Sequence, residues 1–188
     1  TIHPGFFSEA VSQLGHKGKN RNFDLKFITK PTKVRNPKKT IEEAINVLRE
    51  LYVFSDNKLQ LLIENQGSKT SKEDVLFDTV EELNQLKSYI GRKLKFNFNL
   101  AHATLTGIDL RDPKIFRHFW ANSLFFEVSE IKGNYDSHLP VDPQKGTIGS
   151  LLTNYKSMFK KRNIILEYRN IPLDGLKKSY EQVNALGL

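Results

Sequence analysis

Eight residues in the sequence combine side-chain types that bind divalent metal ions with positions at or shortly after the ends of short apolar runs. They are His3, Glu64, Asn99, His102, Glu127, Asp136, His138 and Glu167. Oxygen and imidazole donors are the ligands that hard and borderline divalent ions require. One such residue alone is more often a helix cap or an ion-pair partner. Eight of them after successive runs predict a metal centre, provided that the fold brings them together.

Apolar runs of strand length alternate with amphipathic helical patterns along the chain. The expected strands cover residues 59–64, 94–99, 123–127 and 163–167, and residues 1–3 resemble the end of another. The expected helices cover residues 40–52, 79–90, 113–120, 148–159 and 173–186. Thr40 and Thr79 each precede a glutamate by three residues, as in a capping box. Pro113 takes the favoured first position of its helix.

This alternation predicts an α/β fold with a parallel sheet, because parallel neighbours need crossover connections that helices supply. An open doubly wound sheet and part of a (β/α)8 barrel both fit the pattern, although no glycine-rich nucleotide-binding motif follows a strand. In a barrel the carboxyl ends of the strands converge on the face that carries the active site. Asp136 and His138, two residues apart on extended backbone, would point the same way.

The net charge of +8 comes from one stretch of the chain. Residues 17–39 contain nine Lys and Arg against one Asp, whereas the remaining residues balance to zero. Pro31, Pro37 and several asparagines indicate a loop. Such a charge run is often a solvated insertion. The alternative is a contact with a polyanion, in which Lys17, Lys19, Lys33 and Arg35 bind phosphates.

Two absences limit the class of protein. The sequence has no cysteine, which excludes disulfides and thiolate metal sites. No apolar run has the ~18–20 residues that cross a bilayer, and the first residues do not form a signal peptide. We expect a cytoplasmic protein on these grounds.

Five stretches of the sequence resemble the xylose isomerase-like barrels, which include endonuclease IV and related sugar isomerases and epimerases. They are Ile2-His3-Pro4-Gly5, Leu62-Ile63-Glu64-Asn65, Asn99-Leu100-Ala101-His102-Ala103, Asp136-Ser137-His138-Leu139-Pro140 and Ile165-Leu166-Glu167. The resemblance implies a (β/α)8 TIM barrel of which residues 1–188 supply about the last five β/α units. It implies that a further 70–90 residues precede Thr1, at ~30 residues per unit. Without them the sheet keeps an open edge that can associate with another chain.

The resemblance also assigns roles to the eight residues. In the endonuclease branch, His3 and Glu64 hold a first ion and Glu64 bridges to a second. The second ion would take Asn99, Glu127 and Glu167, and a third would take His102, Asp136 and His138. Asn99 stands where the family has Asp, and Glu127 stands where it has His, so the second ion should bind most weakly.

The leading functional expectation is metal-dependent phosphodiester hydrolysis at abasic sites in DNA. Zinc is the expected ion, with manganese or magnesium as alternatives, and Glu64 and Glu167 are the expected catalytic carboxylates. The first alternative is a sugar or sugar-phosphate isomerase or epimerase with one divalent ion and a phosphorylated sugar in place of damaged DNA. The second is a degraded relative without catalysis.

Overall fold

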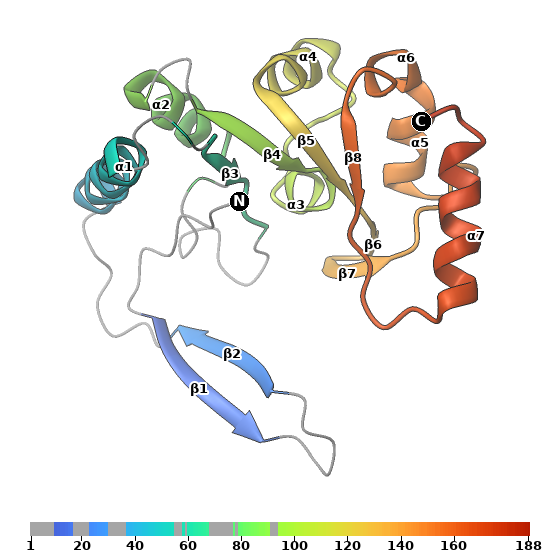
Figure 1. The fold of residues 1–188 in the computed structure, drawn as a ribbon, viewed down its shortest axis with the longest axis horizontal. Coiled ribbons are helices and arrows are strands. Elements are labelled where there is room, and N and C mark those ends of the chain that lie inside the picture. The colour runs from blue at the N-terminus through green and yellow to red at the C-terminus, as the bar shows by residue number, and fades with distance from the viewer. Residues whose placement is uncertain are drawn as a thin grey trace.

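The computed structural model describes residues 10–16, 23–29, 37–54, 58, 60–67, 77, 79–90 and 94–188. A parallel sheet in the order β3-β4-β5-β8 forms its centre (Figure 1). The strands are β3 (Leu62–Glu64), β4 (Lys95–Asn99), β5 (Ser123–Val128) and β8 (Asn163–Leu166). This confirms the predicted parallel α/β architecture. β3 and β8 are the edges of the described sheet, which is open.

Seven helices accompany the strands in the described residues. They are α1 (Pro37–Phe54), α2 (Val80–Ile90), α3 (Leu100–Leu105), α4 (Pro113–Asn122), α5 (Thr147–Asn154), α6 (Lys156–Phe159) and α7 (Leu173–Asn184). Asp112 caps α4 by accepting from Lys114 N at 2.8 Å, and Pro113 begins the helix, as predicted. Thr79 accepts from Glu82 N at 3.2 Å, but Glu82 accepts from Phe77 N, so only half of that capping box forms. No described helix is both long and apolar enough to span a membrane.

The alternation in β4 separates a core face from a site face. Phe96 and Phe98 are fully buried, and Phe98 stacks on Phe119 of α4 with ring centroids 4.3 Å apart. Because successive strand residues point to opposite faces, Asn97 and Asn99 lie on the other side of the sheet. Register pairs Asn99 with Glu127 of β5. The aromatic core thereby holds polar side chains at a fixed position on the opposite face.

Several sequence-based expectations need correction. The stretch 17–39 is not loop throughout, because β2 (Phe23–Thr29) pairs antiparallel with β1 (Ala10–His16) and α1 begins at Pro37. Thr40 is therefore a helical residue and not a cap. The helix expected over 148–159 is divided at Tyr155, whose ring stacks on Phe116 at 4.0 Å and whose hydroxyl donates to Arg111 O at 3.1 Å.

A second antiparallel hairpin was not predicted. β6 (Glu130–Lys132) and β7 (Tyr135–Leu139) follow β5 directly and carry Asp136 and His138 to the carboxyl end of the sheet. Glu130 accepts hydrogen bonds from Ile148 N and Gly149 N, at 3.2 and 2.7 Å. This carboxylate joins the base of the hairpin to the start of α5, so the hairpin is anchored where it leaves the sheet.

Candidate functional site

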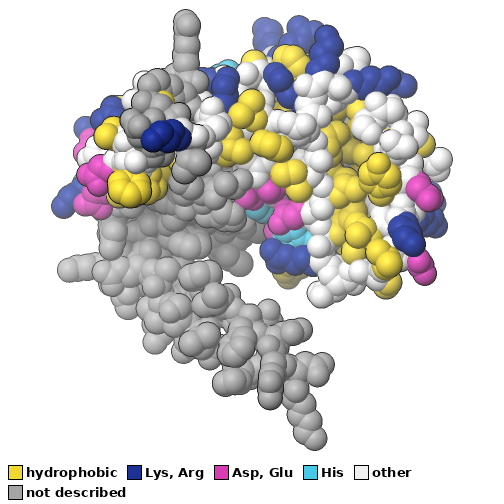
Figure 2. All heavy atoms as spheres, in the orientation of Figure 1, with side chains coloured by type: hydrophobic (Ala, Val, Ile, Leu, Met, Phe, Trp, Pro, Cys, Tyr) yellow, Lys and Arg dark blue, Asp and Glu magenta, His cyan; other side chains and the backbone are white. Residues whose placement is uncertain are grey.

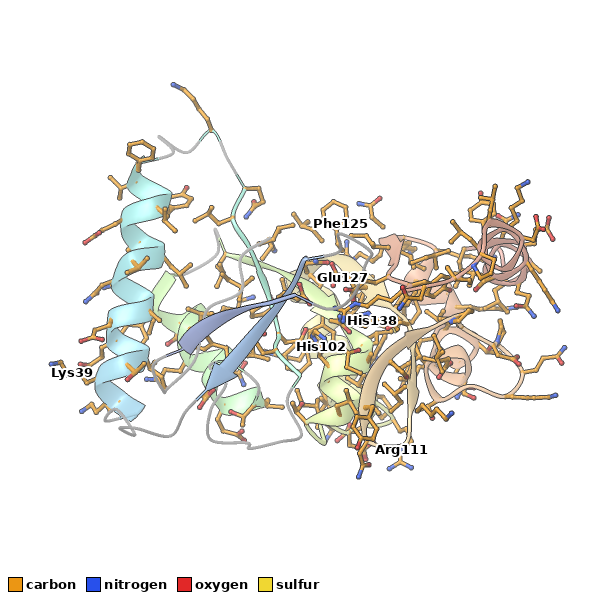
Figure 3. The ribbon with its side chains drawn as sticks, turned by 90° about the horizontal axis from the view of Figure 1, so that it is seen from below. Lys39, His102, Arg111, Phe125, Glu127 and His138 are labelled. Atoms are coloured by element: carbon orange, nitrogen blue, oxygen red, sulfur yellow. The ribbon has the colours of Figure 1, made fainter. Side chains whose placement is uncertain are left out.

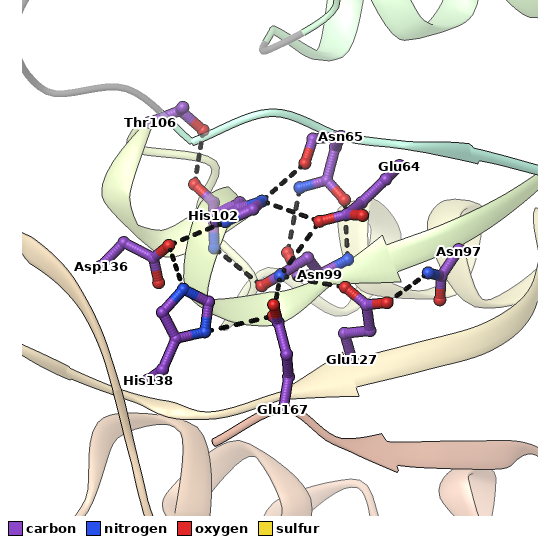
Figure 4. Close-up of polar contacts among 10 residues, drawn as sticks. All are labelled: Glu64, Asn65, Asn97, Asn99, His102, Thr106, Glu127, Asp136, His138 and Glu167. Carbon is purple, nitrogen blue, oxygen red and sulfur yellow. Dashed lines mark hydrogen bonds and ion pairs between the residues drawn. The ribbon is translucent and has the colours of Figure 1, made fainter. Parts of the chain in front are cut away.

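Seven of the eight predicted site residues form one cluster at the carboxyl ends of the parallel strands (Figure 4). Acidic and histidine side chains gather there on the face that Figure 2 shows. The cluster consists of Glu64, Asn99, His102, Glu127, Asp136, His138 and Glu167. The eighth, His3, lies outside the described residues. We name Glu64, Glu127 and Glu167 the carboxylate half, and His102, Asp136 and His138 the imidazole half.

Asn99 ends β4 and places its amide inside the carboxylate half. Its Nδ2 lies 3.3 Å from Glu64 Oε1, 3.3 Å from Glu127 Oε2 and 3.0 Å from Glu167 Oε2. Its Oδ1 accepts from His102 N at 3.1 Å and caps α3. The opposite amide orientation would place an oxygen against three carboxylates and remove the cap. The expected metal ligand atom, Oδ1, therefore points to the helix and not to the glutamates.

Two further asparagines support the cluster and were missed by sequence reasoning. Asn65 accepts from Asn99 N at 2.7 Å and donates to Asn99 O at 3.0 Å, which joins the ends of β3 and β4 through both backbone groups. Asn97 Nδ2 donates to Glu127 Oε1 at 2.5 Å. Both are almost completely buried. The alternation of phenylalanine and asparagine from Phe96 to Asn99 was the available signal.

The imidazole half combines one hydrogen bond, between His102 and Asp136, with close contacts of His138 that are not hydrogen bonds of acceptable geometry. Asp136 Oδ2 lies 3.2 Å from His102 Nε2 and 2.7 Å from His138 Nε2, while His138 Nδ1 lies 3.3 Å from Glu167 Oε2. Neither ring nitrogen of His138 makes a hydrogen bond of acceptable geometry, and Asp136 Oδ1 is also buried without a partner. His138 adopts a φ of 47°, which is uncommon for a residue other than glycine. Such backbone conformations persist where the surrounding structure holds them.

The charges of the cluster perturb one another. Burial raises the pKa of Glu64 to about 7, and the charge of Glu127 adds to that effect. Burial lowers the pKa of His138, but Asp136 and Glu167 outweigh it and raise the pKa to about 9. Burial alone would raise the pKa values of Asp136 and Glu167, but interactions with the histidines bring both below their usual range. Two adjacent carboxyl groups, Glu64 and Glu167, therefore differ in acidity.

His102 links the two halves through α3. Its Nδ1 lies 2.9 Å from Asn65 O and 3.3 Å from Glu64 Oε1, and its pKa is raised because Asp136 and Glu64 outweigh burial. Gly67 passes directly over the ring, where an added Cβ would lie 2.7 Å from His102 Cδ2 and 2.8 Å from its Cα. A side chain at position 67 would therefore displace this histidine.

The donor atoms of both halves have the chemistry of a divalent metal site. One oxygen from each of Glu64, Glu127 and Glu167 lies within 4.8 Å of the others. The imidazole half combines nitrogen and oxygen ligands, which suit zinc. Its unpaired buried atoms fit a bound cation, since such atoms normally have partners. Asn99 Nδ2 already contacts the three glutamates, so the two halves differ in this respect.

The residues expected to bind nucleic acid, Lys17, Lys19, Lys33 and Arg35, lie outside the described residues. One other member of the basic stretch, Lys39, is on α1 and lies well away from His102 and His138 in Figure 3. It lies 3.8 Å from Glu43. Lys39 thus lies away from the cluster.

Three solved structures resemble the fold. A D-tagatose 3-epimerase-like protein aligns with a TM-score of 0.64 and 19% identity over 80% of this chain and 55% of its own. The TTHB071 protein from Thermus thermophilus, soaked with ZnCl2, aligns with a TM-score of 0.58 and 20% identity, over 81% of this chain and 56% of its own. The apo form of the 3-keto-D-glucoside 4-epimerase YcjR from E. coli aligns with a TM-score of 0.59 and 10% identity, over 83% of this chain and 56% of its own.

These likenesses establish a shared fold. The chain spans about 55% of the length of the structures that it matches. Comparison of the sequence with protein-family models and with curated proteins gives no match.

Proposed function

We propose that the chain, which has the partial (β/α)8 fold of the xylose isomerase-like TIM barrels, is a metal-dependent hydrolase. Its proposed reaction is cleavage of phosphodiesters at abasic sites of DNA. One observation carries the proposal. The imidazole half is intact, with His138 Nε2 2.7 Å from Asp136 Oδ2, but the two His138 ring nitrogens and Asp136 Oδ1 are buried without a hydrogen bond of acceptable geometry. A divalent ion held by His102, Asp136 and His138 would provide a partner for these atoms. Zinc is the ion that this ligand set favours.

The residues of the chain supply acid–base groups beside that ion. A bound zinc ion would act as a Lewis acid toward a phosphoryl oxygen and would activate water near neutral pH. Glu167 lies 3.3 Å from His138 and is ionised at neutral pH because its pKa is lowered, so it can accept a proton from water. Glu64, with a pKa of about 7, can hold or release a proton near neutral pH. These are the general acid–base roles that we propose for the two glutamates.

The basic stretch supports a nucleic-acid substrate through its charge. Nine basic residues between 17 and 39 would attract phosphates independently of sequence. We propose that Lys17, Lys19, Lys33 and Arg35 contact the DNA backbone. Each neutralised phosphate contributes about −0.9 to the slope of log K against log salt concentration. Replacing all four residues with Gln should therefore reduce the magnitude of that slope by up to roughly 3–4.

The test compares duplexes with and without an abasic site, using the full chain. We expect zinc-dependent nicking beside the abasic site and loss of nicking after chelation. His138→Ala should abolish nicking, whereas His118→Ala, which removes a histidine from α4 outside the cluster, should retain it. Equal weak binding to both duplexes without nicking would contradict the proposal and favour a non-catalytic relative.

A sugar or sugar-phosphate isomerase or epimerase is the second candidate. It is favoured by the separated pKa values of Glu64 and Glu167, since an acid and a base that share a site need different proton affinities. Two of the similar structures are named as an epimerase-like protein and an epimerase. This candidate predicts turnover of a ketose or its phosphate, lost in Glu64→Gln and Glu167→Gln. The four basic-stretch substitutions should not change that turnover.

A further inference from the structure

The carboxylate half already contains a group that makes the contacts expected of a cation. Asn99 Nδ2 faces oxygens of Glu64, Glu127 and Glu167 at 3.0–3.3 Å. We propose that the Asn99 amide replaces a metal ion there, so that the carboxylate half of this chain holds no ion. The inference deepens the proposed function and rests on its claim that this end of the sheet is a metal centre.

An ion and this amide cannot occupy the carboxylate half together. Divalent ions bind carboxylate oxygens at ~2.0–2.6 Å. The three glutamate oxygens that could share an ion lie within 4.8 Å of one another, so an ion among them would overlap with Nδ2. Binding therefore requires Asn99 to leave, or to turn its oxygen toward the glutamates.

The surroundings of Asn99 hold the amide in this orientation. Its Oδ1 accepts from His102 N at the start of α3, and its backbone N–H and carbonyl are both bonded to the Asn65 side chain. The residue is fully buried, so water cannot replace these partners. Turning the side chain would break the helix cap and three contacts with carboxylates at once. Buried groups that lose partners are costly, which favours the ion-free arrangement.

Aspartate at position 99 would reverse this preference. One carboxylate oxygen could keep the cap on His102 N, while the other would face Glu64, Glu127 and Glu167. Four carboxylates in contact repel one another unless a cation or protons lie between them. Asn99→Asp should therefore create an ion site in the carboxylate half and make the fold depend on that ion.

The experiment counts zinc in the full chain after equilibrium dialysis, by elemental analysis. Glu127→Gln reports on the carboxylate half, because Glu127 contacts Asn97 and Asn99 and not the imidazole half. His138→Ala reports on the imidazole half. Asn97→Asp is the matched control, because it adds the same charge beside Glu127 but away from the centre of the three glutamates.

We expect Glu127→Gln to leave the zinc content of the parent unchanged. Asn99→Asp should bind one zinc more per chain than the parent, and Glu127→Gln in that background should remove it. Asn97→Asp should bind no additional zinc. In chelator, Asn99→Asp should melt at least about 2–4 °C below the parent, and zinc should restore more than that difference.

The two proposals fail separately. If Glu127→Gln binds one zinc less than the parent, the proposed role of Asn99 is overturned. The proposed metal-dependent function is not affected by that result. A parent that binds no zinc, unchanged by His138→Ala, would overturn the metal-dependent function. In that case, an ion gained in Asn99→Asp and lost with Glu127→Gln would still support the role of Asn99. Because Glu127→Gln is tested in the parent, the result does not depend on whether Asn99→Asp folds.

Discussion

The carboxylate half and the imidazole half are in contact through His102 and Glu64 and through His138 and Glu167, but the polar atoms of the two halves have different partners. Each glutamate of the carboxylate half contacts Asn99 Nδ2. In the imidazole half, both His138 ring nitrogens and Asp136 Oδ1 are buried without a hydrogen-bond partner. One amide thus contacts all three carboxylates of the first half, whereas in the second half His138 is in close contact with Asp136 and Glu167 without a hydrogen bond of acceptable geometry.

This difference teaches that a set of potential ligands does not by itself define a metal site. The Asn99 Nδ2 group lies 3.0–3.3 Å from all three carboxylates. Among His102, Asp136 and His138, the His102–Asp136 contact is a hydrogen bond, whereas His138 lies 2.7 Å from Asp136 without a hydrogen bond of acceptable geometry. The comparison predicts where an ion binds, and the following tests address it in order of expected effect.

The largest effect is expected for His138→Ala. Removing this proposed ligand should lower the zinc affinity of the chain by more than about 100-fold, since loss of an outer-shell partner alone costs about 10–100-fold. Competition with a chromophoric chelator measures this affinity. Glu127→Gln should change it little. Similar losses in the two variants would show that both halves hold one ion.

The next effect is the pH dependence of zinc affinity. The metal-free His138 has a pKa raised to about 9, and a histidine ligand must be neutral to bind. Zinc binding should therefore release a proton, and affinity should rise by up to about tenfold per pH unit between pH 7 and 9. Glu167→Gln removes one of the carboxylates that raise this pKa, so the rise should end at a lower pH.

The same groups predict the stability of the metal-free chain. A histidine whose pKa is higher in the folded state stabilises the fold below its unfolded value of 6.5, and this contribution is lost as pH rises through about 9. A glutamate raised from 4.5 to about 7 stabilises the fold below pH 4.5 and loses that contribution by about pH 7. Urea titrations without zinc should show lower stability at pH 9 than at pH 6, and zinc should offset the loss. Equal stability at the two pH values would contradict the assigned protonation states.

Much of the site was predictable because strand ends are visible in a sequence. Apolar runs that alternate with capped helices indicate parallel strands, and their carboxyl ends must share an edge. Glu64, Asn99 and Glu167 could therefore be grouped before their contacts were known. Asp136 and His138 were predictable as a pair from their spacing, although the hairpin that carries them was not.

The remainder depended on contacts between distant segments. The roles of Asn65 and Asn97 follow from the register of β3, β4 and β5, which sequence periodicity does not fix. The division of the helix at Tyr155 follows from packing on Phe116, 39 positions earlier. The strand from Phe23 to Thr29 was missed because its charge outweighed the alternation of Phe23, Leu25 and Phe27 with polar residues.

A smaller effect is expected for Gly67→Ala. The added Cβ would approach the His102 backbone as well as its ring, so the ring cannot simply rotate away. Displacement of His102 should lower zinc affinity by about tenfold, and the clash should lower the free energy of unfolding by about 1–3 kcal/mol. Gly107→Ala is the control, because its φ of 84° is unfavourable for alanine but nothing lies near the new atom. It should lose stability and keep its zinc affinity.

The smallest effect on metal binding is expected for Asn97→Ala, which removes an amide from the carboxylate half without touching the imidazole half. Glu127 would lose the hydrogen bond from Asn97 Nδ2, which is buried on the site face of β4. A buried acceptor that loses its donor costs about 1–3 kcal/mol, so urea titration should show a loss of that order. Zinc affinity should change less than about twofold, because outer-shell losses of 10–100-fold apply to partners of the ligands themselves. A tenfold loss would mean that Glu127 orients a zinc ligand, and the two halves would then have to be treated as one metal site.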